Sequence, residues 1–232
     1  MYDACKPFGP LIYKADIRGE FHDFLLNGLD DAKDSSSMKS YLVGNIENQK
    51  SAAPYDHSKF IKFLHPHIEN YIQEKYNSVI EIRKLCLDAV KPTWNSKKHH
   101  ITYDLYTGPW VNFQQKHEFN PLHKHSGSIS SIIFIDIPEE IEQERNDSDF
   151  TLRAAGCLEF VHINQHHIVK PKSGYMYLFP ANLWHQVYPY KSDVERVTMS
   201  FNLFDVRIDG QPVIDITSME GFPWPIDEIV EE

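Results

Sequence analysis

"NPLHKHSGSISSIIFIDIP" (residues 120–138) places two histidines, His123 and His125, directly before a run with the character of a buried strand. This isoleucine-rich run lies between Gly127 and Pro138, and its near-continuous apolar character is typical of a strand covered on both faces. On an extended segment, residues i and i+2 point to the same side, so both imidazoles can reach one metal ion. Two histidines alone hold a metal weakly, and a metal site therefore requires a third ligand from elsewhere in the chain.

Further short β-rich runs follow Pro92, and glycine, proline and asparagine separate them. Together with the run above, the expected strands are HITYDLY (100–106), PWVNFQQ (109–115), SISSIIFIDIP (128–138), CLEFVHI (157–163), HHIVKP (166–171), YMYLFP (175–180), HQVYPY (185–190) and RVTMSFNLFDV (196–206). Strands of this length and spacing predict a β-sandwich or a barrel of the jelly-roll type.

From residue 18 to about residue 90 the spacing of apolar residues is helical instead. Apolar residues at steps of three and four predict a short helix around residues 21–29, a longer one around 60–72 and a third over 79–90. Pro66 is expected to kink the longer helix or to divide it.

Helices followed by strands predict an α+β fold in which the helices pack on one sheet. No internal repeat or low-complexity linker divides the chain, so we expect a single domain over residues 1–232. Its parts would be a mostly helical layer (1–95), a β-barrel core (96–207) and a C-terminal extension (208–232).

The composition restricts the classes of partner. Lys and Arg number 23 against 33 Asp and Glu, which gives a net charge of −10. No basic stripe is present, so general nucleic-acid binding is disfavoured. The three cysteines, Cys5, Cys86 and Cys157, are never in CxxC spacing, which favours a reducing compartment and argues against a thiolate zinc site. Because there is neither a signal-peptide pattern nor an apolar stretch of about 18 residues, we expect a cytoplasmic protein without membrane contact.

His185 is the best candidate for the third ligand. It follows a Pro-Ala-Asn turn in FPANLWHQVYPY and begins a β-rich run, which would place it near the rim of a barrel. The pair His65 and His67 has the spacing of His123 and His125 but lies in helical periodicity, where residues i and i+2 diverge, so we assign it to packing or to the surface.

Arg196 opens an otherwise apolar strand, and a cation buried there must find an anion. One reading is an ion pair with a neighbouring Asp or Glu. The other is a ligand carboxylate held bidentately by the guanidinium, with Thr198 donating a further hydrogen bond from the same strand face.

Two acidic segments have less defined roles. The polar segment 138–156 is either a lid or binding loop, or a solvated insertion or short surface helix. The C-terminal DEIVEE is most simply a solvated tail.

The order of these residues resembles the iron(II)- and 2-oxoglutarate-dependent dioxygenases, which are built on the double-stranded β-helix, a jelly-roll or cupin-like barrel. The resemblance is stronger still to a 2-oxoglutarate/Fe(II)-dependent oxygenase family of bacteria and phages that is related in fold to the prolyl hydroxylases. It spans about residues 103–205. It rests on an ordered set: Trp110-Val111-Asn112, His123-Lys124-His125, Ser130 and Ser131, Gly174 through Phe179-Pro180, His185 through Pro189, and Arg196 through Ser200-Phe201-Asn202.

The resemblance implies that His123 and His185 bind Fe(II) and that 2-oxoglutarate chelates the same iron. Arg196, with Thr198, would hold the distal carboxylate of 2-oxoglutarate. With O2, the co-substrate would yield succinate and CO2 while a C–H bond of a peptide or protein side chain, or of a small molecule, is hydroxylated. Where the broader superfamily has aspartate, this chain has His125. His125 is either a third ligand, which we favour because its spacing is that of the carboxylate, or a residue that points toward the substrate or lies behind the ligands. The second alternative would leave a two-histidine site with water in the third position.

Other residues are expected around the same cavity. Asn112, Tyr103 and Tyr106 lie on strands that should line it, and Ser131 is a candidate hydrogen-bond partner of the co-substrate. Trp184 is expected in the core.

Three classes of function remain at this stage. The first is a 2-oxoglutarate-dependent hydroxylase. The second is a three-histidine metal dioxygenase of the cupin kind that needs no 2-oxoglutarate, although such an enzyme has no use for the Arg196 and Thr198 pair. The third is a non-catalytic β-barrel binding module with surface histidines.

Overall fold

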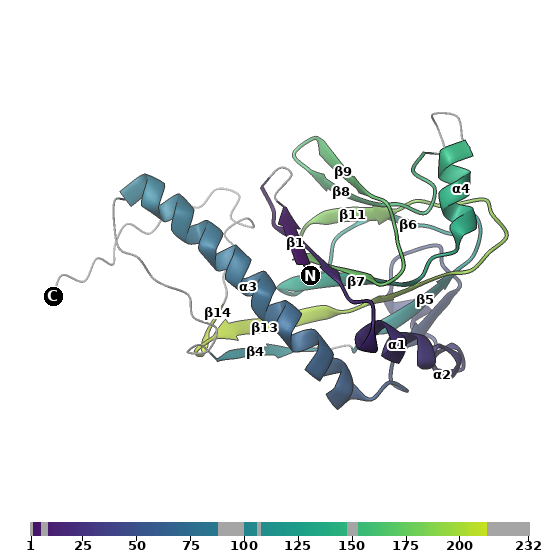
Figure 1. The fold of residues 1–232 in the computed structure, drawn as a ribbon, viewed down its shortest axis with the longest axis horizontal. Coiled ribbons are helices and arrows are strands. Elements are labelled where there is room, and N and C mark those ends of the chain that lie inside the picture. Colours follow the sequence, from purple (N-terminus) through teal and green to yellow (C-terminus); the bar gives the residue numbers. More distant parts are fainter. Residues whose placement is uncertain (1, 6–8, 88–99, 106–107, 148–152, 213–232) are drawn as a thin grey trace.

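The computed structural model describes residues 2–5, 9–87, 100–105, 108–147 and 153–212. Within these residues the chain forms a large ten-stranded sheet and a small four-stranded sheet, with helices α1 and α3 packed on the outer face of the large sheet (Figure 1). In sequence order the elements are β1 (Tyr2–Cys5), β2 (Ile12–Asp16), α1 (Glu20–Asn27), α2 (Leu29–Lys33), the 3-10 helix η1 (Lys39–Tyr41), β3 (Asn48–Ser51), α3 (His57–Leu87), β4 (Ile101–Asp104), β5 (Trp110–Gln114), β6 (Asn120–His123), β7 (Ile129–Asp136), α4 (Glu139–Asp147), β8 (Leu158–His162), β9 (Gln165–Val169), β10 (Tyr175–Pro180), β11 (Trp184–Val187), β12 (Arg196–Ser200), β13 (Asn202–Ile208) and β14 (Gln211–Pro212).

Eight of the described strands form the barrel between the two sheets. The large sheet contributes β10, β7, β12 and β5 in that order, and the small sheet has the order β6, β11, β8 and β9. Along the chain these strands alternate between the two sheets, except that the β8–β9 hairpin stays in the small sheet, and their pairings are antiparallel. This alternation is that of a double-stranded β-helix. The predicted α+β fold, with helices packed on one sheet of a jelly-roll barrel, is therefore confirmed.

Strand β7 shows how the sequence produces the two layers. Because side chains alternate along a strand, Ile133 and Ile135 face the core under the helices, whereas Ile132 and Phe134 face the core between the sheets. All but the last of its residues are buried, which explains the near-continuous apolar run.

Helix α3 is continuous through Pro66, so the expected division of the helix is wrong. Its apolar face continues on both sides of the proline, with Phe60, Leu64 and Ile68 buried against the large sheet. Pro66 itself lies on the exposed side. On this side, a carbonyl that loses its helical hydrogen bond can accept one from water instead. The packing of the buried face therefore keeps the helix continuous through the proline. The third helix predicted over 79–90 is part of α3 as far as Leu87, and the rest of that range lies outside the described residues.

Residues 1–95, which were expected to form a mostly helical layer, also contain three strands. β1, β2 and β3 extend the large sheet at its two edges, with β2 pairing with β10 and β3 pairing with β5.

The acidic segment 138–156 contains α4, so the prediction of a short surface helix is correct for this part. Ile141 and Arg145 of α4 are buried, and Glu144 accepts hydrogen bonds from the backbone of Lys191 and Ser192.

Helix α3 and the other helices of the described part lack a segment long and apolar enough to cross a membrane. Cys157 is a buried free thiol. The DEIVEE tail lies outside the described residues.

Candidate functional site

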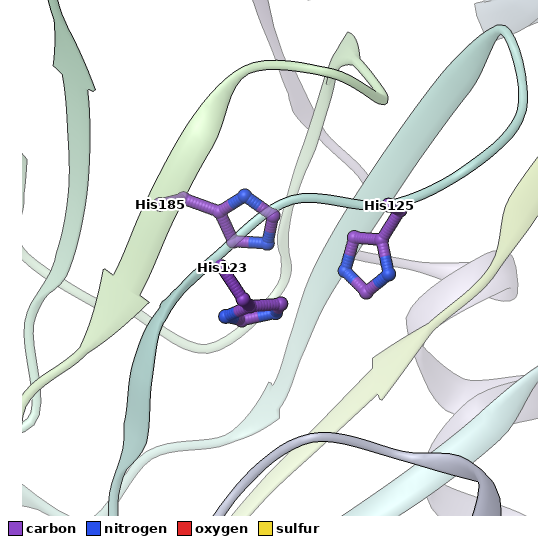
Figure 2. Close-up of side chains that lie close together, drawn as sticks. All are labelled: His123, His125 and His185. Atoms are coloured by element: carbon purple, nitrogen blue, oxygen red, sulfur yellow. The ribbon is translucent and has the colours of Figure 1, made fainter.

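His123 and His185 lie directly opposite each other on neighbouring strands of the small sheet. His123 is the last residue of β6 and His185 is the second residue of β11, and the antiparallel register pairs the two. Their ring centroids are 4.3 Å apart. Figure 2 shows both rings, with that of His125, turned toward a common space. Strand pairing thus brings together two histidines that are far apart in the sequence.

A backbone contact of the same kind orients both rings. Nδ1 of His123 lies 2.7 Å from the carbonyl oxygen of Pro121, and Nδ1 of His185 lies 2.9 Å from that of Leu183. A carbonyl oxygen only accepts hydrogen bonds, so Nδ1 carries the proton in both rings and Nε2 keeps its lone pair. Metal-binding histidines are commonly held in this way.

His125 completes a cluster of three imidazoles. It lies two residues beyond β6, and its backbone N–H donates to the carbonyl of Ala181. Its ring centroid is 4.9 Å from that of His123 and 5.1 Å from that of His185. One ring nitrogen from each of the three lies within 4.8 Å of the other two. Among the described residues no side-chain hydrogen bond fixes the ring of His125, in contrast to the other two. His123, His125 and His185 are called the histidine cluster below.

Burial keeps the histidine cluster neutral. It lowers the pKa of His123, and it lowers the pKa of His125 to about 4 with a further contribution from His123. The pKa of His185, which is the most deeply buried of the three, lies well below its ordinary value for the same reasons. Neutral imidazoles have free lone pairs, and imidazole nitrogen is a ligand that suits iron, zinc, copper and nickel. The donor set therefore fits a divalent transition metal.

Arg196 is buried without an anionic partner. Its side chain is 1% exposed, and its guanidinium lies 5.3 Å from the ring centre of Phe134. Nη1 donates to Oε1 of Gln114 at 2.8 Å, whereas Nε and Nη2 have no hydrogen-bond partner. Burial lowers the pKa of Arg196 to about 10, so it remains a cation at neutral pH. No Asp or Glu of the described ranges pairs with it, which disfavours the reading of Arg196 as half of an ion pair within the chain.

Thr198 lies on the same face of β12 as Arg196, and both are buried. Asn112 of β5 is its cross-strand partner, and Nδ2 of Asn112 donates to Oγ1 of Thr198 at 3.3 Å. Gln49 of β3 is the cross-strand partner of Asn112 in turn, and its Nε2 donates to Oδ1 of Asn112 at 3.1 Å. A row of polar side chains therefore crosses three strands. Arg196 and Thr198 are called the Arg–Thr pair below.

One cavity contains both the histidine cluster and the Arg–Thr pair. Asn112 and Gln49 also line it, as do Asn120 and Ser200. The rest of its wall is mostly apolar: Leu42, Val43, Ile46, Trp110, Ile132, Leu158, Phe179 and Val187. The cavity thus combines apolar walls with polar groups that converge on one space, as small-molecule sites do.

Two residues predicted for this site, Tyr103 and Ser131, make contacts other than those expected. Tyr103 lies on β4, which pairs with β13 away from the barrel, and its hydroxyl is 3.1 Å from Nδ1 of His65 on α3. The prediction that Tyr103 lines the cavity is therefore wrong. Ser131 borders the cavity, but its hydroxyl donates to the carbonyl of Phe201 and accepts from the N–H of the same residue, both at 2.9 Å. It has no proton left to donate to a ligand.

Three other predictions near the site have different outcomes. Tyr106 lies outside the described residues. Trp184 is 44% exposed, with the ammonium of Lys124 5.3 Å from its ring centre, so its assignment to the core is wrong. His65 and His67 are in packing positions, as expected, because His67 contacts the hydroxyl of Tyr13 at 3.1 Å.

Sequence reasoning missed Gln49 and Gln114, whose side chains contact Asn112 and Arg196. Gln114 is two residues after Asn112 on β5 and therefore lies on the same strand face, so the sequence pattern could have identified it as a site residue. Gln49 could not be found in this way, because the register of β3 against β5 is not encoded in either segment alone.

The sequence of the barrel matches a known family model. Residues 108–202 match the model described as "Putative 2OG-Fe(II) oxygenase". The matched stretch runs from β5 to the end of β12 and contains the histidine cluster and the Arg–Thr pair. The resemblance drawn from the sequence is confirmed over these residues, and the match supports an oxygenase of this class. The family implies Fe(II) and 2-oxoglutarate as cofactor and co-substrate, and the neutral imidazoles of the cluster are donors that fit iron(II).

Solved structures of similar architecture include three oxygenases. A prolyl hydroxylase from Trichoplax adhaerens, solved with a hypoxia inducible factor oxygen degradation domain peptide fragment, is 13% identical, with 84% of this chain and 83% of that chain covered and a TM-score of 0.48. A prolyl-4-hydroxylase from Pseudomonas putida is 10% identical, with 82% and 91% covered and a TM-score of 0.40. A 2OG-Fe(II) oxygenase family oxidoreductase from Burkholderia pseudomallei is 10% identical, with 87% and 71% covered and a TM-score of 0.40. A search of curated proteins found no match.

Proposed function

We propose that this protein is an Fe(II)- and 2-oxoglutarate-dependent dioxygenase that hydroxylates a C–H bond of its substrate and releases succinate and CO2. We further propose that residues 1–232 act as one oxygenase domain. The family match supports the class of enzyme, and the cavity supports the roles given below to individual residues.

The observation that carries the proposal is the buried, unpaired guanidinium of Arg196. A protein that only binds metal has no reason to keep a cation in its interior without an anion, because burial of an uncompensated charge is costly. Nε and Nη2 form one edge of the guanidinium, and this edge can hold the two oxygens of a carboxylate side by side. The cavity that Arg196 lines also contains the histidine cluster, so a dicarboxylate with a metal-chelating end matches both halves.

The residues have distinct roles in this proposal. His123 and His185 hold Fe(II) through Nε2, since their Nδ1 atoms are protonated and bonded to carbonyls. The Arg–Thr pair holds the distal carboxylate of 2-oxoglutarate, with Thr198 donating its hydroxyl proton. Arg196 is buried, which strengthens its interaction with a carboxylate. When bound, the iron supplies the oxidative chemistry with O2, and the protein groups position the reactants.

His125 is proposed as the third ligand. Its ring is as close to the other two histidines as a shared metal requires, and burial keeps it neutral. A third imidazole in place of a carboxylate leaves the metal site one unit more positive, which favours binding of dianionic 2-oxoglutarate. The substrate is proposed to be a peptide or protein side chain or a small molecule.

The test is an anaerobic titration. Fe(II) is added to the purified protein, then 2-oxoglutarate, and the visible metal-to-ligand charge-transfer band is recorded. Oxygen is then admitted and succinate is assayed, with and without mixtures of peptides and small molecules. We expect the band, and succinate formation that depends on Fe(II). Absence of both would contradict the proposal.

A second candidate is a three-histidine metal dioxygenase that does not use 2-oxoglutarate. One observation favours it: among the described residues, the group of side chains that could hold a metal ion consists of histidines alone. The same titration separates the candidates, because such an enzyme would bind Fe(II) but give neither the charge-transfer band with 2-oxoglutarate nor succinate.

A further inference from the structure

Strand β5 places an amide side chain opposite each member of the Arg–Thr pair. The register pairs Gln114 with Arg196 and Asn112 with Thr198, and each amide contacts its cross-strand partner through a hydrogen bond. Gln114 and Asn112 are two residues apart and therefore lie on one strand face. All four side chains are buried. Cross-strand neighbours are the closest side-chain pairs in a sheet, so β5 is the strand that determines how this pair is oriented.

Gln114 has one orientation only. Its Nε2 donates to the carbonyl of Glu118 at 2.6 Å, which leaves Oε1 to accept from Nη1 of Arg196. The turn at Glu118 is itself anchored, since the carboxylate of Glu118 accepts from the N–H of Gln115 at 2.7 Å. The hydroxyl of Tyr190 further joins the strands, because it donates to the carbonyl of Gln114 and accepts from the N–H of Arg196. The guanidinium is thus fixed by its Nη1 atom, and its Nε and Nη2 atoms remain available.

The chemical type of residue 114 is as informative as its position. The position directly across from a buried arginine is where a carboxylate would form an ion pair, yet an uncharged amide occupies it. Glutamate has the same length and shape as glutamine but would neutralise the guanidinium and compete for it. The amide gives Arg196 a hydrogen bond without giving it a counter-charge.

Asn112 acts on Thr198 in a parallel way. A hydroxyl has one proton to donate, and Nδ2 of Asn112 donates to Oγ1 of Thr198. Thr198 therefore keeps its own proton for another acceptor. Gln49 fixes the direction of this contact, because its Nε2 occupies Oδ1 of Asn112.

We propose that Gln114 and Asn112 are positioning residues that orient the Arg–Thr pair and keep its positive charge uncompensated, so that the site selects a carboxylate ligand. This inference rests on the proposed function. It adds a determinant of specificity that lies outside the ligand's direct contacts: the neutral residue at position 114 decides whether Arg196 is available to a carboxylate.

Two substitutions of Gln114 test the inference. Gln114→Glu keeps shape and adds charge, and Gln114→Met keeps approximate volume and removes the hydrogen bond. Affinity for 2-oxoglutarate is measured by anaerobic calorimetry on the Fe(II)-loaded proteins, and the thermal midpoint is measured on the metal-free proteins without 2-oxoglutarate. Fe(II) affinity is the control, since residue 114 does not belong to the histidine cluster.

Gln114→Glu and Gln114→Met are expected to differ in their affinity for 2-oxoglutarate. Both variants lose the amide donor to the carbonyl of Glu118, but only Gln114→Glu gives Arg196 a counter-charge, so its affinity for 2-oxoglutarate should fall by about 100-fold or more. Gln114→Met should be less stable and should bind 2-oxoglutarate about tenfold more weakly. A merely structural role would lower the affinity for 2-oxoglutarate to a similar extent in both variants.

Two outcomes distinguish a failure of this inference from a failure of the proposed function. If wild type binds 2-oxoglutarate and Gln114→Glu binds it equally well, or no more weakly than Gln114→Met does, the inference is overturned and the proposed function stands. If the Fe(II)-loaded wild type does not bind 2-oxoglutarate at all, the proposed function is overturned and the inference falls with it.

Discussion

His123 and His185 are a directly paired cross-strand couple, and each donates its Nδ1 proton to the carbonyl of the residue two positions earlier. The two rings therefore present Nε2 to the same cavity without any side-chain partner to hold them. We expect His123→Ala and His185→Ala each to abolish stoichiometric Fe(II) binding, as measured by anaerobic equilibrium dialysis. His65→Ala is the matched control, because His65 belongs to a His-x-His sequence on a helix. Retention of Fe(II) by either cluster variant would contradict the assigned ligands.

His125 is the residue at which this chain departs from the usual two-histidine, one-carboxylate triad. His125→Asp restores the carboxylate, so it should retain Fe(II). It should also weaken 2-oxoglutarate binding, because the metal site becomes one unit less positive. His125→Ala should lose roughly tenfold or more in Fe(II) affinity if the imidazole is a ligand. Calorimetry of both steps checks this, and Fe(II) affinity unchanged in His125→Ala would show that His125 is not a ligand.

Arg196 can be replaced by methionine, which fills similar space without charge. Arg196→Met should bind Fe(II) normally but lose about 100-fold or more in affinity for 2-oxoglutarate, since a bidentate charge-assisted contact is removed. Its thermal midpoint should not fall, because an uncompensated buried cation is removed as well. Loss of Fe(II) binding or a strongly lowered midpoint would indicate that Arg196 has a structural role instead.

His67, which lies outside the candidate site, makes the free energy of unfolding depend on pH. Burial lowers its pKa below the ordinary 6.5, and its ring contacts the hydroxyl of Tyr13 and stacks on Phe21. Because the unfolded chain binds the proton more readily, the stabilising contribution is fully present above pH 6.5 and is lost as pH falls toward the folded pKa.

In denaturant titrations between pH 7.5 and about 5, His67→Gln should therefore lose less unfolding free energy than wild type. His57→Gln, at an exposed position at the start of α3, serves as the control and should follow wild type. Equal slopes for wild type and His67→Gln would contradict this assignment.

Much of the fold and part of the site were readable from the sequence. The period-two pattern after Pro92 predicted most strands of the barrel, and the spacing of His123, His125, His185 and Arg196 predicted residues that the structure places around one cavity. Such predictions succeed because alternation along a strand determines which side chains share a face.

The failures have identifiable physical causes. β3 has the sequence NQKS, whose lack of apolar residues conceals a strand that pairs with β5. Tyr103 was misplaced because the pairing of β4 with β13 is long-range and leaves no local trace. The hydroxyl of Ser131 is taken by the backbone of Phe201 at the break between β12 and β13, and Gln114 is opposite Arg196 only through register. Pairing between distant segments is the information that periodicity lacks.

The most direct test of the central claim is a crystal structure of the protein grown anaerobically with Fe(II) and 2-oxoglutarate. We predict a metal ion bound by Nε2 of His123 and Nε2 of His185, with the distal carboxylate of 2-oxoglutarate on Nε and Nη2 of Arg196 and on the hydroxyl of Thr198. A 2-oxoglutarate molecule bound elsewhere, or a metal held by other residues while Arg196 keeps its Nε and Nη2 atoms unpaired, would contradict the account.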